Sequence, residues 1–165
     1  MLLAMFARRG AIFALVVLTG CASLPPRIDQ RATLGPTAKQ MFTFRMTAQN
    51  GREPTFEEMS RWQDQMDQLI SRYLAEHPEV ANAMDVFTFR YERQVGIGMS
   101  KEQVLILMGA PVQVTADAAE IEKLAGRFAA QIKGNATEVW VYPVGWRLFF
   151  AGQRVVDITQ FVPSF

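Results

Sequence analysis

Residues 98–111 have the sequence GMSKEQVLILMGAP, which contains a start signal and a stop signal for one short helix. Ser100 is followed three residues later by Gln103, so each side chain can bond the backbone N–H of the other in a capping box. Gly109 suits the left-handed conformation that ends a helix, and Pro111 prevents its extension. We therefore expect a compact helix with one apolar side packed inward. Its inward side chains are expected to be Val104, Leu107 and Met108.

The chain after this helix is rich in strand-forming residues. Alternating side chains predict a strand at 137–143, and a second β-rich run at 146–158 is divided by Gly152, which supplies a turn. We expect an α+β fold in which helices pack on one face of a small three-stranded antiparallel meander. A further helical pattern at 117–133 would lie between the short helix and this meander.

Aromatic side chains are concentrated in the predicted meander. Sheet residues of this kind form either the core or a surface that contacts another protein, and we expect about half of them to be buried. The candidates for partner contact are Trp140, Tyr142, Trp146, Phe149 and Phe150.

The first half of the chain contains the longest helical pattern. Thr55 and Glu58 form a second capping box, and an apolar stripe continues at spacings of three and four to about Glu76. We expect this stripe to pack against the C-terminal sheet, with a partner-binding stripe as the alternative. Residues 41–46 alternate and predict a short strand. The stripe consists of Met59, Trp62, Met66, Leu69, Ile70 and Tyr73.

Cys21 is the only cysteine, and it follows a basic pair at Arg8 and Arg9 and an apolar run at 11–18. This run is too short for a bilayer of roughly 30 Å, so residues 1–20 are predicted to be a secretory signal peptide. A twin-arginine export route and a buried apolar helix with a core cysteine are the alternatives. The segment Leu18-Thr19-Gly20-Cys21 resembles the lipobox of bacterial lipoproteins. This resemblance implies cleavage before Cys21 and acyl chains on its sulfur.

Residues 21–40 would then connect the lipidated cysteine to the folded part. Several prolines and a glycine interrupt this segment, and neither helical nor strand periodicity is present. We expect a flexible, extended tether with a reach on the order of 60 Å. The expected organisation is a signal peptide (1–20), a tether (21–40), a helical N-terminal extension (41–94) and an α+β domain (95–165).

Residues 98–111 also resemble the Gly-Met-Thr-Lys-Glu-Gln-Val…Leu-Gly-x-Pro segment of the SmpA/OmlA family, the BamE-like lipoprotein domains. The runs at 137–143 and 146–158 are similar to the aromatic strand and closing hairpin of that family, in the same order. The resemblance covers roughly residues 95–160. It implies a scaffolding role among outer-membrane proteins, as in the β-barrel assembly machine. Ala22 follows the lipidated cysteine, and by the sorting rule of enteric bacteria it favours the outer membrane.

Composition and motifs argue against several other classes of function. Without residues 1–20 the chain has 15 basic and 16 acidic residues, so no broad cationic surface for nucleic acid is expected. No serine-hydrolase, zinc-protease or phosphate-loop motif is present, and the single histidine, His77, cannot form a zinc site with the lone cysteine. We therefore expect no catalysis, cofactor, metal or small-molecule substrate.

These observations predict a non-catalytic, lipid-anchored envelope protein. It would face the periplasm, attach to the outer membrane through acyl chains on Cys21, and scaffold or stabilise a complex of outer-membrane proteins. The alternative is a periplasm-facing binding or inhibitor module, because the helix-plus-meander layout resembles that of β-lactamase-inhibitor proteins. The third hypothesis is an envelope hydrolase without a recognised motif.

Overall fold

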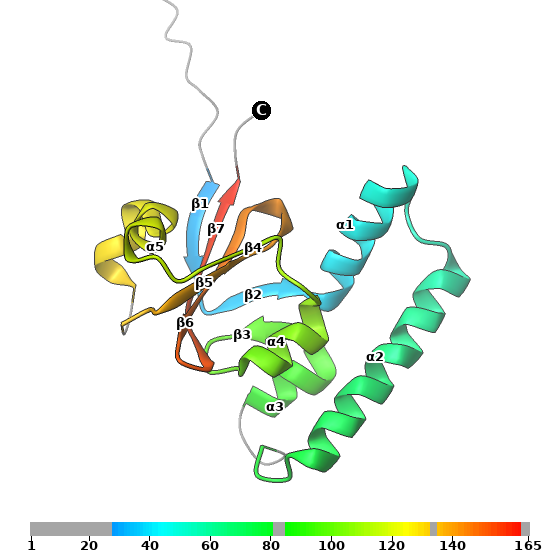
Figure 1. Ribbon diagram of the computed structural model, residues 1–165. Coiled ribbons are helices and arrows are strands. Elements are labelled where there is room, and N and C mark those ends of the chain that lie inside the picture. Colours follow the sequence, from blue (N-terminus) through cyan, green and yellow to red (C-terminus); the bar gives the residue numbers. More distant parts are fainter. Residues whose placement is uncertain (1–27, 81–84, 133–134, 163–165) are drawn as a thin grey trace, which may run out of the picture.

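The computed structural model describes residues 28–80, 85–132 and 135–162, so the predicted signal peptide and Cys21 lie outside the described residues (Figure 1). Short 3-10 or π-helical turns are labelled η. The elements in chain order are β1 (Ile28–Ala32), β2 (Leu34–Thr37), α1 (Ala38–Asn50), α2 (Phe56–Glu76), α3 (Asp85–Phe87), η1 (Thr88–Glu92), β3 (Gln94–Gly96), α4 (Lys101–Met108), β4 (Gln113–Thr115), α5 (Ala118–Ala125), η2 (Gly126–Gln131), β5 (Glu138–Val141), η3 (Pro143–Gly145), β6 (Trp146–Ala151) and β7 (Arg154–Val162).

The α+β fold contains a five-stranded antiparallel sheet in the order β1-β7-β6-β5-β4, together with a two-stranded sheet of β2 and β3. The prediction of a three-stranded meander was wrong, because β5, β6 and β7 are only the centre of a larger sheet. Strand β1 adds to one edge, where Ile28 lies opposite Val162. Strand β4 adds to the other edge and pairs with β5 from Gln113 to Thr115. These two edge strands are short or polar, so alternation did not indicate them.

Helices cover both faces of the sheet, which also corrects the predicted arrangement. Neighbouring residues of a strand point to opposite faces. On β5, Val139 packs with α5, whereas Trp140 belongs to the larger core beneath α1, α2 and α4. Figure 1 shows α5 on one side of the sheet and these three helices on the other. Strands with apolar residues on both faces require cover on both sides.

The helix predicted within residues 98–111 and its capping box are confirmed, but Gly109 has a ψ of −164° and so is not in the left-handed helical region. Ser100 Oγ accepts a 3.1 Å hydrogen bond from the Gln103 N–H, and Gln103 Oε1 accepts a 2.8 Å bond from the Ser100 N–H. Helix α4 ends at Gly109, which has a φ of +66°. The Tyr142 hydroxyl donates to the Gly109 carbonyl at 2.9 Å, and Arg45 of α1 donates to the carbonyl of the next residue at 2.9 Å. The helix end therefore joins α1 to β5. The predicted inward residues Val104, Leu107 and Met108 are all buried.

The predictions for residues 28–46 were wrong. Residues 28–40, expected to be part of the tether, form β1, β2 and the start of α1, and residues 41–46 are helical rather than extended. Thr37 and Gln40 form a capping box at the start of α1, and Gly51 ends it in the left-handed conformation. This box and the end signal at Asn50-Gly51 outweigh an alternation only six residues long.

Helix α2 begins at the predicted capping box of Thr55 and Glu58. Its apolar side packs on α1 and α4 rather than on the sheet, and the rings of Phe42 and Trp62 stack at 4.8 Å. The predicted helix at 117–133 is α5 followed by the 3-10 turn η2, because the chain changes direction at Gly126, which has a φ of +56°. No helix among the described residues is long and apolar enough to cross a membrane.

Candidate functional site

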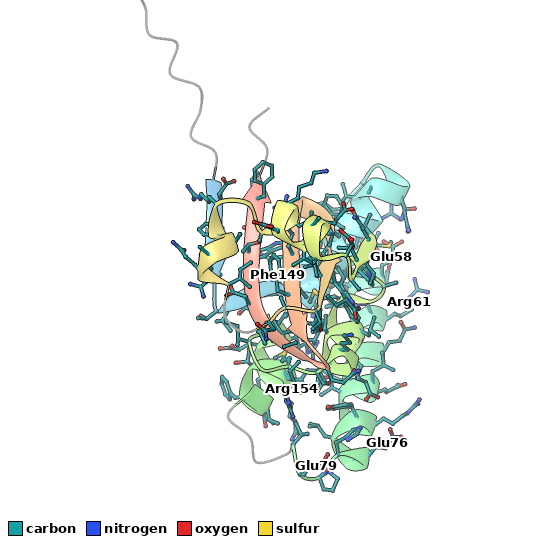
Figure 2. All side chains as sticks on the ribbon, turned by 60° about the vertical axis from the view of Figure 1, so that its left-hand side comes forward. Glu58, Arg61, Glu76, Glu79, Phe149 and Arg154 are labelled. Carbon is teal, nitrogen blue, oxygen red and sulfur yellow. The ribbon has the colours of Figure 1, made fainter. Side chains whose placement is uncertain are left out.

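Four of the five aromatic residues predicted to contact a partner lie in the core. Trp140 is 6% exposed, and Tyr142, Phe149 and Phe150 are buried at least as fully. Phe149 points to the α5 face and appears beside the yellow α5 and η2 segment in Figure 2, whereas the other three belong to the core beneath α4. These four side chains therefore stabilise the fold and do not form a binding face. Trp146, which is partly buried against the core, remains as a candidate.

Polar contacts explain why two of the buried aromatic residues are tolerated in the core. The Trp140 indole N–H donates to Glu138, and Lys101 lies 2.6 Å from the same carboxyl group. Burial raises the pKa of Glu138, but the bonds from Lys101 and Trp140 outweigh burial and leave the pKa below its ordinary value. Burial raises the pKa of the Tyr142 hydroxyl, which the Arg45 charge opposes. The shifts favour the charged form of Glu138 and the neutral form of Tyr142.

The partly buried Trp146 lines a groove between α1 and the start of β6. The groove has a volume of about 640 Å³, and its apolar lining includes Met41 and Phe44 of α1. Phe44 is 42% exposed, and Val144 of η3 is 44% exposed. The rest of the lining is polar except for Trp146, and Lys39 is its only charged residue. The polar lining residues are Gln30, Lys39, Gln40, Thr43 and Gln160.

The turn that presents Val144 is strained. Val144 has a φ of +59° and a ψ of +27°, a left-handed conformation that β-branched residues rarely adopt. Its carbonyl accepts a 3.1 Å hydrogen bond from Gln160, which in turn accepts a 2.7 Å bond from Gln30. The next residue, Gly145, lies so close to β7 that an added Cβ would be 1.7 Å from the Phe161 carbonyl oxygen. Strained backbone of this kind is concentrated at functional sites.

This groove is suited to binding apolar side chains. Its lining combines three at least partly exposed apolar groups with polar side chains, as protein-binding surfaces do. Phe44 and Val144 were not among the predicted site residues. Phe44 was assigned to a strand, and the positive φ of Val144 depends on the close approach of Gly145 to β7. Only the Pro-Val-Gly turn sequence could have drawn attention to this segment.

Among the described residues, no three His, Cys, Asp or Glu side chains lie close enough together to hold a metal ion. No protein-family model matches the chain, and no curated protein or solved structure is significantly similar to it. The SmpA/OmlA resemblance of residues 98–111 stays a prediction from a short motif.

Proposed function

We propose that this chain is a lipid-anchored, non-catalytic envelope protein that binds an outer-membrane protein through the groove between α1 and β6. The observation that carries the proposal is the set of accessible apolar side chains in this groove, Phe44, Val144 and Trp146. A role in β-barrel assembly follows from the SmpA/OmlA resemblance and is part of the proposal. Attachment follows from the lipobox-like segment that ends at Cys21.

The position of the groove supports a partner near the membrane. Strand β1 begins at Ile28, seven residues after Cys21, so the described domain starts within about 25 Å of the acylated sulfur. This reach is less than half of that expected for a tether of residues 21–40. Gln30, in the middle of β1, lines the groove together with Gln160, near the end of β7. The groove therefore includes a residue of β1, the described strand that follows Cys21 most closely in the sequence (Figure 1).

The test is affinity capture of the full chain from detergent-solubilised membranes, with Phe44→Gln compared with the wild type. Phe44 is half-exposed, so its replacement should leave the thermal unfolding temperature nearly unchanged while capture of an integral outer-membrane protein falls at least tenfold. Tyr91→Gln is the matched control, because Tyr91 is 64% exposed and does not line the groove.

Three results would contradict the proposal. The first is equal capture by Phe44→Gln and the wild type, which would exclude the groove. The second is an equal loss in Tyr91→Gln, which would show a non-specific effect of surface aromatic residues. The third is groove-dependent capture of a soluble periplasmic protein, which would replace the outer-membrane scaffold with the inhibitor-like alternative.

A further inference from the structure

The sheet face opposite the main core contains a second, polar pocket. It has a volume of about 330 Å³ and lies between the α5–η2 segment and the adjoining ends of β1, β6 and β7. This volume is within the range of small-molecule sites. The lining residues used below are Asp29, Lys123, Arg127, Arg147, Thr159 and Phe161.

Strand register brings the polar residues of this face together. Arg31 of β1 lies opposite Thr159 of β7, and Thr159 lies opposite Arg147 of β6. Asp29 is two residues before Arg31, so it points to the same face and is diagonal to Thr159. Arg31 is already bonded to the buried Asp157 through two nitrogens at 2.8–3.0 Å. The other three residues, Asp29, Thr159 and Arg147, help to line the pocket next to this ion pair.

Two buried oxygen atoms in this pocket have no hydrogen-bond partner in the described structure. They are Oγ1 of Thr159, whose residue is 2% exposed, and Oδ1 of Asp29. Buried polar atoms are almost always bonded, and leaving one unpaired is unfavourable for the folded state. Both atoms belong to residues that line this pocket, so a small side-chain rotation would let a bound polar group complete their hydrogen bonding.

The cationic groups of the pocket outnumber its single carboxylate. Arg127 donates to the Asp29 backbone carbonyl, and its Nε lies 3.8 Å from the Asp29 carboxylate. Arg147 donates to the Leu124 carbonyl, and its guanidinium lies 5.0 Å from the centre of the Phe161 ring. Burial lowers the pKa of Arg147, and the Asp29 charge opposes this shift. With Lys123, three cations and one carboxylate line the pocket, so a bound anion would reduce the excess positive charge.

We propose that this pocket binds a small organic carboxylate that carries a hydroxyl or ammonium group on the neighbouring carbon. The carboxylate pairs with the planar guanidinium of Arg147, which has five N–H donors and can bind two oxygens at once. The neighbouring donor bonds Asp29 Oδ1, with the Thr159 hydroxyl completing the contact. The Phe161 ring supplies an apolar wall for the rest of the ligand.

The test uses 2-hydroxy-3-phenylpropanoate and phenylalanine as probes in titration calorimetry with the full chain. At least one probe should bind with one-to-one stoichiometry, and about tenfold more tightly than 3-phenylpropanoate, which lacks the second donor. Arg147→Gln should weaken binding at least tenfold. Arg61→Gln is the matched control, because Arg61 lies on the exposed side of α2 (Figure 2) and should bind like the wild type.

Thr159→Val is nearly isosteric and tests the pocket even where Arg147→Gln fails to fold. This variant should keep its fold and lose part of the preference for the probe over 3-phenylpropanoate. Amide shifts in NMR should change for Gly126 and Thr159 and not for residues of α2. The proposal is overturned if neither probe binds, if Thr159→Val leaves the preference intact, or if inorganic phosphate binds as tightly as the probes.

Discussion

Gly109 shows how a single residue determines the way three elements meet. Its backbone has a φ of +66° and a ψ of −164°, a combination available almost only to glycine. An added Cβ would lie 2.7 Å from Nη1 of Arg45, the side chain that connects α1 to the end of α4. The residue therefore provides both the conformation and the space for this connection.

Gly109→Ala is expected to lower the free energy of unfolding by about 1–3 kcal/mol, since both the backbone and the Arg45 contact are strained. Urea unfolding followed by circular dichroism measures this loss. Gly51→Ala is the matched control, because Gly51 has a φ of +68° with no atom within 4 Å of an added Cβ. A loss in Gly51→Ala as large as that in Gly109→Ala would show that the Arg45 contact contributes nothing.

Val144 differs from Gly109, because it is a β-branched residue in a strained backbone conformation and its side chain is exposed. Val144→Gly should raise the free energy of unfolding by up to about 1 kcal/mol, since left-handed strain costs more than the extra freedom of glycine in the unfolded chain. The same variant should capture less of the partner. Val114→Gly, at an exposed position without positive φ, should instead be destabilised. A marked loss of stability in Val144→Gly would contradict this prediction and show that the Val144 side chain contributes to the packing of the core.

At the scale of elements, the start of α2 combines a cap with an ion pair. Glu58 accepts a 2.7 Å hydrogen bond from the Thr55 N–H and lies 2.8 Å from Arg52. The bond from Arg52 and the capping bond lower the pKa of Glu58 from 4.5 to about 2. A lowered pKa contributes stability above pH 4.5, and this contribution is lost as the pH falls from 4.5 towards 2.

Glu58→Gln keeps a capping group but removes the charge, so its unfolding temperature should depend less on pH between 4.5 and 2 than that of the wild type. Thermal unfolding across this range measures the difference. Glu57→Gln removes a neighbouring charge from the same helical turn, and it should retain the pH dependence that Glu58 provides. Parallel profiles for Glu58→Gln and the wild type would show that this ion pair does not couple folding to protonation.

The helix starts at Thr55 and Ser100 were predictable from the sequence because a capping box involves residues only three apart. The edge strands β1 and β4 were not, since each is defined by pairing with a distant strand rather than by its own alternation. The same limit applies to the site. Trp146 was among the predicted contacts, but its exposure and the grouping with Phe44 depend on how α1 packs beside β6.

At the scale of the whole molecule, the proposed anchor and the described domain are separate parts of the chain. Cys21 precedes β1 by seven residues, so Cys21→Ser should move the protein from the membrane fraction to the soluble fraction without changing its unfolding temperature. Fractionation and circular dichroism measure the two effects. A Cys21→Ser protein that stays in the membrane fraction would contradict lipid anchoring.

The most direct test of the central claim is photo-crosslinking in intact cells from a benzoyl-phenylalanine placed at position 44 in the groove. We predict one crosslinked integral outer-membrane protein from position 44, none from the control position 91, and loss of the crosslink in the Cys21→Ser background. No crosslink from position 44, or the same product from position 91, would contradict the proposal that this groove binds a membrane partner.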